Sequence, residues 1–151
     1  MKTPILAAAL MLAASAAPAQ EMTLTTPSER GGQIGSPETF TGTVFVAPVF
    51  GPGMNEVSAG EVTFLPGARS AWHTHPVGQY LIVTAGTGWY QEEGQPKRVM
   101  RPGDVVFAPA GVNHWHGATG ATPVTHYAIQ AAEDGSAVTW GAPVSDADYA
   151  G

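Results

Sequence analysis

The residues of this chain that could do chemistry are its histidines. All five fall between residues 73 and 126 of a 151-residue sequence, at His73, His75, His114, His116 and His126. An imidazole ring can bind a transition metal through one nitrogen and can exchange a proton near neutral pH. Histidines that meet in space could therefore hold a metal ion, transfer protons, or do both.

His73 and His75 lie two residues apart on a predicted strand, so both side chains point to one face, about 7 Å apart along the chain. A Pro-Val-Gly turn follows, and a hairpin return would bring the amide oxygen of Gln79 back beside this pair. His114 follows a second turn and can arrive from a neighbouring strand. Three imidazoles and one oxygen leave one or two coordination positions open, which a catalytic metal requires. The spacing predicts one divalent metal ion on His73, His75, Gln79 and His114.

The elements that must position these residues are short strands. The chain has 19 glycines, 13 prolines and only 12% charged residues, a composition that suits many strands joined by tight turns. No window repeats apolar residues at helical spacing over three turns, so helix is expected only near Asp146 to Tyr149. The pattern predicts an all-β fold, either closed or in two layers. The expected strands are 41–46, 56–65, 70–75, 79–85, 88–92, 97–101, 104–108 and 123–130.

One folded domain is expected, because 151 residues fit a single hydrophobic core. Residues 1–19 combine a lysine, an apolar run and small residues, which is the layout of a secretory signal peptide. The apolar run from Ile5 to Ala14 is shorter than the ~20 residues that a membrane anchor needs. Residues 20–39 are polar and rich in Gly, Pro, Ser and Thr, so we expect an extended arm that could pack against a partner subunit. The folded domain is expected at 40–151.

Charge and cysteine content narrow the function classes further. The formal net charge is -6 at pH 7, which argues against nucleic acid as a partner. The chain has no cysteine, so neither a disulfide nor lipid attachment after the signal peptide is expected. We expect the mature protein to work in the periplasm without a membrane anchor.

The histidine spacing resembles the two signature motifs of the cupin superfamily, which here cover Gly67 to Gly86 and Gly103 to Ala118. The resemblance implies a double-stranded β-helix, a jelly-roll-like barrel that commonly forms homodimers or higher oligomers. Two positions depart from the usual pattern, since Gln79 stands where most such cupins carry Glu and Ala118 where Asn is usual. A neutral amide leaves the formal charge of the site at the +2 of the metal, so a bound oxyanion would be held more strongly.

A closer resemblance connects the run from Phe64 to Pro76, Gln79, the run from His114 to Ala118, and His126 to one group of small bacterial cupins. These cupins act as manganese-dependent (R)-selective hydroxynitrile lyases. The resemblance implies a small cyanohydrin as substrate, the four metal ligands named above, and a base at His126. It also places His116 and Ser70 close to the reacting atoms.

Side-chain alternation adds to this set. His126 and Gln130 share one face of the strand at 123–130 with small residues, and that face could line a cavity. Ser70 is out of phase with His73, so its approach to the metal needs a bulge or a turn. An apolar wall is expected to accept the side chain of the aldehyde. The residues predicted to contact substrate are Val62, Phe64, Leu81 and Gln130.

Two other functions fit the same residues. One is a cupin dioxygenase that uses iron or manganese on a small phenol, diketone or acid. The other is a non-catalytic protein of the cell envelope that binds a metal or a small ligand. The donor set does not select the ion, because three imidazoles and an amide suit iron, nickel, cobalt and zinc as well as the manganese that the resemblance implies.

Overall fold

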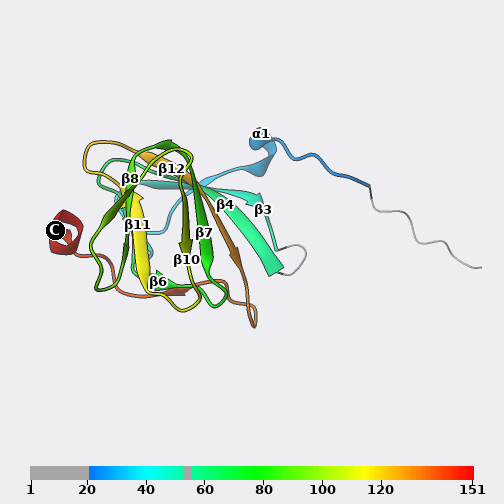
Figure 1. The fold of residues 1–151 in the computed structure, drawn as a ribbon. Coiled ribbons are helices and arrows are strands. Elements are labelled where there is room, and N and C mark those ends of the chain that lie inside the picture. Colours follow the sequence, from blue (N-terminus) through cyan, green and yellow to red (C-terminus); the bar gives the residue numbers. More distant parts are fainter. Residues whose placement is uncertain (1–20, 53–55) are drawn as a thin grey trace, which may run out of the picture.

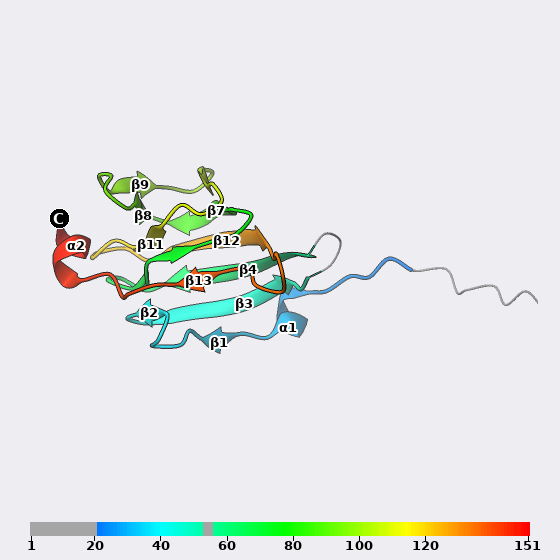
Figure 2. The same ribbon diagram turned by 90° about the horizontal axis from the view of Figure 1, so that it is seen from below.

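The computed structural model describes residues 21–52 and 56–151. The predicted signal peptide at 1–19 lies outside the described residues. Within them, Figure 1 and Figure 2 show two antiparallel sheets that face each other and enclose one core. The prediction of an all-β fold is confirmed.

The first sheet has six strands. In spatial order they are β1 (Gln33–Ile34), β3 (Val44–Phe50), β4 (Val57–Phe64), β12 (Val124–Ala131), β7 (Gln79–Gly86) and β10 (Val105–Ala108). The second sheet contains β13 (Thr139–Trp140), β6 (His73–Thr74), β11 (His114–Ala118), β5 (Arg69–Ser70) and β2 (Phe40–Thr41), with β8 (Gly88–Glu92) and β9 (Arg98–Met100) attached. Its centre is β11, which pairs with β8 along one edge and with β6 and β5 in turn along the other.

Inward-facing side chains of both sheets form the core. Along β4 and β12 every second residue points inward, as Val62 and Phe64 do on β4 and Val124 and Ala128 do on β12. Burial of a side chain as large as valine or phenylalanine stabilises a fold by roughly 1.5–3 kcal/mol. The other buried members of this cluster are Val44, Ala68, Leu81, Val83, Met100 and Ala118.

The expected strand at 70–75 is divided in two. Between β5 and β6, the backbone N–H of Ala71 donates to the Thr39 carbonyl at 2.9 Å and that of Trp72 to the Ala142 carbonyl at 3.0 Å. These two amides therefore bond to other segments instead of to β11. Ser70 and His73 are three residues apart, so an unbroken strand would point them to opposite faces. The interruption lets both side chains be buried.

β11 and β13 were not among the expected strands. β11 is short and is buried at all five positions. β13 has only two residues and forms through a contact between segments far apart in the chain. Both strands matter for the site because each lies directly beside β6.

The N-terminal arm is less extended than expected. Pro27–Arg30 form a helical turn, α1, and the Glu29 carboxylate accepts a hydrogen bond from the Thr26 backbone N–H at 2.7 Å. β1 then joins the edge of β3, and Arg30 pairs with Glu61 at 3.1 Å. The arm therefore packs on its own barrel (Figure 2). In the described part of the chain, no helix has the length and apolar character needed to cross a membrane.

Residues 137–150 form a C-terminal strap along the second sheet. Its strand β13 pairs with β6, and the guanidinium of Arg69 donates twice to the Val144 carbonyl, at 3.1 and 2.8 Å. The strap ends in α2 (Asp146–Ala150), where the Tyr149 hydroxyl donates to the Ala118 carbonyl at 2.9 Å. The expected short helix near Asp146 is thus confirmed, and it lies at the opposite end of the barrel from α1 (Figure 1).

Gly86 should be far less replaceable than Gly94, although the two have almost the same positive φ, 75° and 76°. An alanine at either position costs about 1–2 kcal/mol for this backbone conformation. At Gly86 the added Cβ would also clash with the Pro123 carbonyl, whereas at Gly94 it meets nothing within 4 Å. Overpacking should add about 1–3 kcal/mol to the loss in Gly86→Ala. Urea denaturation measures both variants, and equal losses would contradict this packing.

Candidate metal centre

Strand pairing brings His73 and His114 side by side. His73 on β6 is the direct partner of His114 on β11 and, on its other edge, of Trp140 on β13. Directly paired residues point to the same face of a sheet, and the ring centroids of His73 and His114 lie 4.3 Å apart. The ring of His75 lies 5.1 Å from that of His73 and 5.7 Å from that of His114. All three histidines are buried.

A backbone carbonyl orients each of these rings. The Nδ1 atoms of His73, His75 and His114 lie 2.9, 2.6 and 2.9 Å from carbonyl oxygens. A carbonyl only accepts, so in the neutral ring Nδ1 has the proton and Nε2 has a lone pair. The Nε2 atoms of His73 and His75 are buried and have no hydrogen-bond partner among the described residues. The three carbonyls belong to Ala71, Ala137 and Val112, respectively.

Gln79 brings an oxygen to the same point. Its Oε1 lies 3.2 Å from Nε2 of His114, and its Nε2 donates to Oε1 of Gln130 at 3.4 Å, which fixes the direction of the amide. Because the proton of His114 is on Nδ1, the 3.2 Å contact joins two acceptors with no hydrogen between them. Two buried lone pairs that face each other are unfavourable unless a cation lies beside both. The donors present therefore fit a metal ion.

Burial keeps these histidines neutral. It lowers the pKa of His73 to about 3, with the nearby His114 adding to the effect. Burial also lowers the pKa of His75 and the pKa of His114. The neutral imidazole is the form that binds a metal, because a proton would occupy the lone pair. At neutral pH the site can therefore accept a cation without first releasing a proton.

His116 and His126 form a second pair beside this group. Nε2 of His126 lies 3.1 Å from Nδ1 of His116, so one nitrogen donates to the other. Burial lowers the pKa of His126 to about 4 and holds the pKa of His116 well below its usual value. The Ser70 hydroxyl accepts a hydrogen bond from the backbone N–H of His116 at 3.2 Å. The pair is therefore neutral at pH 7, and Ser70 holds the backbone of one of its members.

A cavity of about 170 Å³ opens onto the histidines. This volume is below the roughly 300–1,000 Å³ of pockets that bury drug-sized ligands, so the cavity suits a small molecule. Its polar lining consists of His73, His75, Gln79, His116 and Gln130. The rest of its wall is made by Phe40, Val46, Gly60, Val62, Ala128, Val138 and Trp140.

The structure divides the predicted substrate-binding residues. Val62 and Gln130 line the cavity. Phe64 does not, because it is one inward position further along β4, level with Val124, and is completely buried in the core. Leu81 also lies elsewhere, in the core and beside a separate small pocket next to β10.

The predicted base is likewise set back from the cavity. His126 is fully buried and is not part of the cavity wall, whereas His116 is. The 3.1 Å contact with His116 is the connection of His126 to the cavity. Of the two histidines, His116 is therefore the one that could touch a bound molecule.

Sequence reasoning missed Phe40, Val138 and Trp140, which all line the cavity. Trp140 is 39% exposed, and its ring lies 4.8 Å from that of His73 and 5.8 Å from that of Phe40. No motif contains these residues, and the pairing of β13 with β6 has no local signal. The single hint in the sequence is the presence of a tryptophan in a segment of otherwise small residues.

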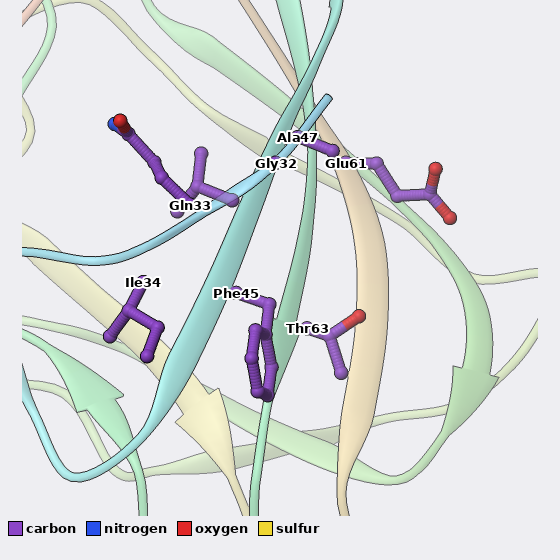
Figure 3. Close-up of a pocket in the computed structure, with 8 residues that line it drawn as sticks. Gly32, Gln33, Ile34, Phe45, Ala47, Glu61 and Thr63 are labelled. Atoms are coloured by element: carbon purple, nitrogen blue, oxygen red, sulfur yellow. The ribbon is translucent and has the colours of Figure 1, made fainter. Parts of the chain in front are cut away.

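A second hollow lies on the outer face of the first sheet, between β1, β3 and β4 (Figure 3). At about 240 Å³ it is larger than the cavity over the histidines. Its one titratable side chain is Glu61, which already pairs with Arg30. The side chains around it in Figure 3 include Ile34, Phe45 and Thr63, which offer no catalytic group. Of these two hollows, the interior cavity with its three histidines is therefore the candidate site.

His116 competes with His75 for a place among the ligands. One nitrogen each of His73, His114 and His116 lie within 4.8 Å of one another, a group that could hold a metal ion and that does not include His75. The Nδ1 of His116 faces another histidine, however, while His75 has the same carbonyl anchor as His73 and His114. The anchoring favours His75 over His116 as the third histidine ligand.

Comparisons with known proteins agree with this fold. A family model of the cupin domain matches residues 60–129. An (R)-mandelonitrile lyase from Granulicella tundricola is 53% identical over 116 residues, which are 76% of this chain and 88% of that protein. A dimethylsulfoniopropionate lyase, DddQ, from Ruegeria pomeroyi is 35% identical over 65 residues, 42% of this chain and 32% of that protein.

Solved structures give the same result. The crystal structure of a cupin-like protein from Thermotoga maritima matches with a TM-score of 0.75 and 41% identity, over 78% of this chain and 90% of that one. The polyketide cyclase RemF from Streptomyces resistomycificus matches with a TM-score of 0.69 over 85% of this chain and 91% of that one. Its 14% identity shows likeness of fold alone.

Two facing antiparallel sheets with buried histidines around an internal cavity define a class of small β-barrels that could hold a metal ion. The chain belongs to the cupin superfamily, as the histidine spacing predicted. The predicted double-stranded β-helix is confirmed by the sheets and by the likeness to solved cupins. The resemblance to hydroxynitrile lyases is confirmed as similarity to a protein named (R)-mandelonitrile lyase.

Acid should destabilise the metal-free protein through its buried histidines. His73 and His126 have pKa values of about 3 and about 4 in the folded protein, against about 6.5 in an unfolded chain. Below the unfolded value the unfolded chain binds protons that the folded protein does not, so the free energy of unfolding decreases as pH falls. The decrease should reach about 1.4 kcal/mol per pH unit for each such histidine. Urea denaturation from neutral to mildly acidic pH measures it, with a smaller slope expected for His126→Gln. Stability that rises on acidification would be incompatible with this site.

His75→Ala should remove bound metal far more than His116→Ala does. Loss of a direct ligand should weaken binding by more than about a hundredfold, and loss of a neighbouring residue by about tenfold or less. Equilibrium dialysis against manganese or zinc, followed by elemental analysis, measures the difference, and thermal melting checks that both variants are folded. The opposite order would assign the ion to the group of His73, His114 and His116.

Proposed function

We propose that the protein is a metal-dependent lyase that cleaves and forms cyanohydrins. In cleavage a base takes the hydroxyl proton while the bond between the carbinol carbon and the nitrile carbon breaks. The base then returns this proton to the released cyanide, so the products are an aldehyde and hydrogen cyanide. The similarity to an (R)-mandelonitrile lyase over 88% of that protein supports this reaction. The observation that carries the proposal is a neutral set of metal donors with a neutral histidine, His116, beside it in a small cavity.

We place the ion on the Nε2 atoms of His73, His75 and His114 and on Oε1 of Gln79. This choice rests on the two partnerless nitrogens and on the contact between two acceptors. When bound, a divalent ion would stabilise the negative charge that develops on cyanide or on the substrate oxygen, and no ligand carboxylate reduces its charge. Manganese is proposed from the resemblance to manganese-dependent lyases, since the donors also suit iron, nickel, cobalt and zinc.

The resemblance implied His126 as the base, but we assign this role to His116. His116 lines the cavity, and its Nδ1 is occupied by His126, so Nε2 is the nitrogen left for a substrate. For this role His116 donates from Nδ1 to His126 and takes the hydroxyl proton on Nε2. His126 then orients the ring and stabilises its charged form. Ser70 holds the backbone of His116 and is proposed to act by position.

Export and self-association are further proposals. The layout of residues 1–19 supports export to the periplasm with removal of this segment. A homodimer or higher oligomer is supported by large apolar side chains on the outer face of the first sheet, because exposed apolar patches often mark protein contacts. The exposed side chains are Ile34, Phe45, Tyr80, Val105 and Phe107.

The manganese-loaded protein should release benzaldehyde from mandelonitrile faster than free manganese does, with preference for the (R) enantiomer. His116→Ala should lower kcat by about 10²–10⁴-fold, the usual contribution of a general base, while the bound metal stays near its original amount. Tyr80→Phe, on the outer face, is the matched control and should leave kcat unchanged. The absorbance of benzaldehyde measures the rate.

Other outcomes of the same assay separate the alternatives. A rate no higher than that of free manganese would reject the lyase. Oxygen consumption with a small phenol, diketone or acid would instead indicate a cupin dioxygenase. No turnover of any of these compounds, with ligand affinity unchanged in His116→Ala, would indicate a non-catalytic binding protein.

A further inference from the structure

The C-terminal strap contributes a wall of the cavity that lies outside both cupin motifs. Val138, just before β13, and Trp140, on β13, both line the cavity. Trp140 is the ladder partner of His73, so the two side chains point the same way. With 39% of its surface exposed, Trp140 lies at the mouth of the cavity.

Trp140 and Phe40 form an aromatic corner. Their ring centroids are 5.8 Å apart and their planes meet at 67°. The nearby wall is aliphatic, made by Val46, Val62 and Ala128. A flat aryl group between these surfaces could contact one ring by its face and the other by its edge, the two arrangements that aromatic pairs prefer. A short alkyl chain has no ring and could form neither of these aromatic contacts.

We infer that Trp140 is a specificity-determining residue that binds the aryl group of an aromatic aldehyde or its cyanohydrin. The identity of the substrate rests on the proposed function, but binding of the aldehyde alone requires no turnover. The aryl group would lie against the indole, with the carbonyl carbon toward His116 and the metal donors. The choice between aryl and alkyl substrates is thus made by the strap and not by the motif residues.

Backbone hydrogen bonds hold this wall in place. The N–H of Gly141 donates to the Trp72 carbonyl at 2.7 Å, and the N–H of Trp72 donates to the Ala142 carbonyl at 3.0 Å. A Cβ at Gly141 would lie 3.1 Å from the Trp72 carbonyl oxygen, which shows how closely the two backbones approach. Because the backbone on both sides of this wall is held before a ligand arrives, little backbone freedom is lost on binding.

The strap also touches the metal donors directly. The Ala137 carbonyl lies 2.6 Å from Nδ1 of His75, three residues before Trp140. The indole itself packs on the ring of His73 at 4.8 Å. A change at Trp140 could therefore act through the metal instead of the aryl group, so metal content must be measured together with ligand binding.

The test is ligand-observed NMR titration of the zinc-loaded, diamagnetic protein with benzaldehyde and with propanal. Trp140→Ala should weaken benzaldehyde binding about tenfold and propanal binding less than about twofold, while Trp140→Phe should stay within about threefold for both. Trp89→Phe changes a tryptophan away from the cavity and is the matched control. If Trp140→Ala does not fold, Trp140→Leu makes the same comparison with a larger side chain.

The inference is overturned if folded, metal-replete Trp140→Ala binds benzaldehyde as tightly as the unchanged protein does. It is equally overturned if the affinity for benzaldehyde and the affinity for propanal fall by the same factor. It is also overturned if the unchanged protein does not bind benzaldehyde. The expected binding pattern without cyanohydrin turnover would reject the proposed function alone. Cyanohydrin turnover in which Trp140→Ala does not alter the preference for aryl over alkyl aldehydes would reject this inference alone.

Discussion

The convergence of buried lone pairs at one point is the constraint on which the rest of the structure depends. Carbonyl anchors fix the proton of each ring on Nδ1, so three Nε2 atoms and the Gln79 oxygen are all acceptors. An unpaired buried acceptor costs about 1–3 kcal/mol, and facing acceptors also repel. A cation removes both penalties together. The same anchors would hold the ligands in place around a bound ion, as partners of metal-binding histidines usually do.

The fold provides these anchors from three separate segments. Ala71 lies in the break between β5 and β6, Val112 precedes β11, and Ala137 begins the C-terminal strap. The break in the strand shapes this site, because the Ala71 carbonyl there contacts Nδ1 of His73 and the shift of phase leaves Ser70 and His73 both buried. The strap then completes the cavity with Trp140, and its far end is tied to the barrel through Arg69.

The sequence predicted the all-β fold and the two cupin motifs, because each depends on short-range spacing. The choice of His73, His75, Gln79 and His114 as the metal ligands stays a prediction. The sequence did not predict β13 or the place of Trp140, since these depend on a contact between segments far apart in the chain. The expected apolar wall of Val62, Phe64 and Leu81 is buried as a whole, but the sequence could not say that Val62 faces the cavity while Phe64 and Leu81 fill the core. The same limit applies to His126, which points inward but reaches the cavity only through His116. The alternation of side chains along a strand tells which face of the sheet a residue is on, but not how far along the barrel it lies.

Anomalous scattering from crystals of the metal-loaded protein, collected at the absorption edge of the bound ion, tests the central claim most directly. The account predicts one peak, about 2.0–2.2 Å from Nε2 of the three carbonyl-anchored histidines and from Oε1 of Gln79. A peak bonded to His116 in place of His75, or a Gln79 side chain turned away from the ion, would contradict it.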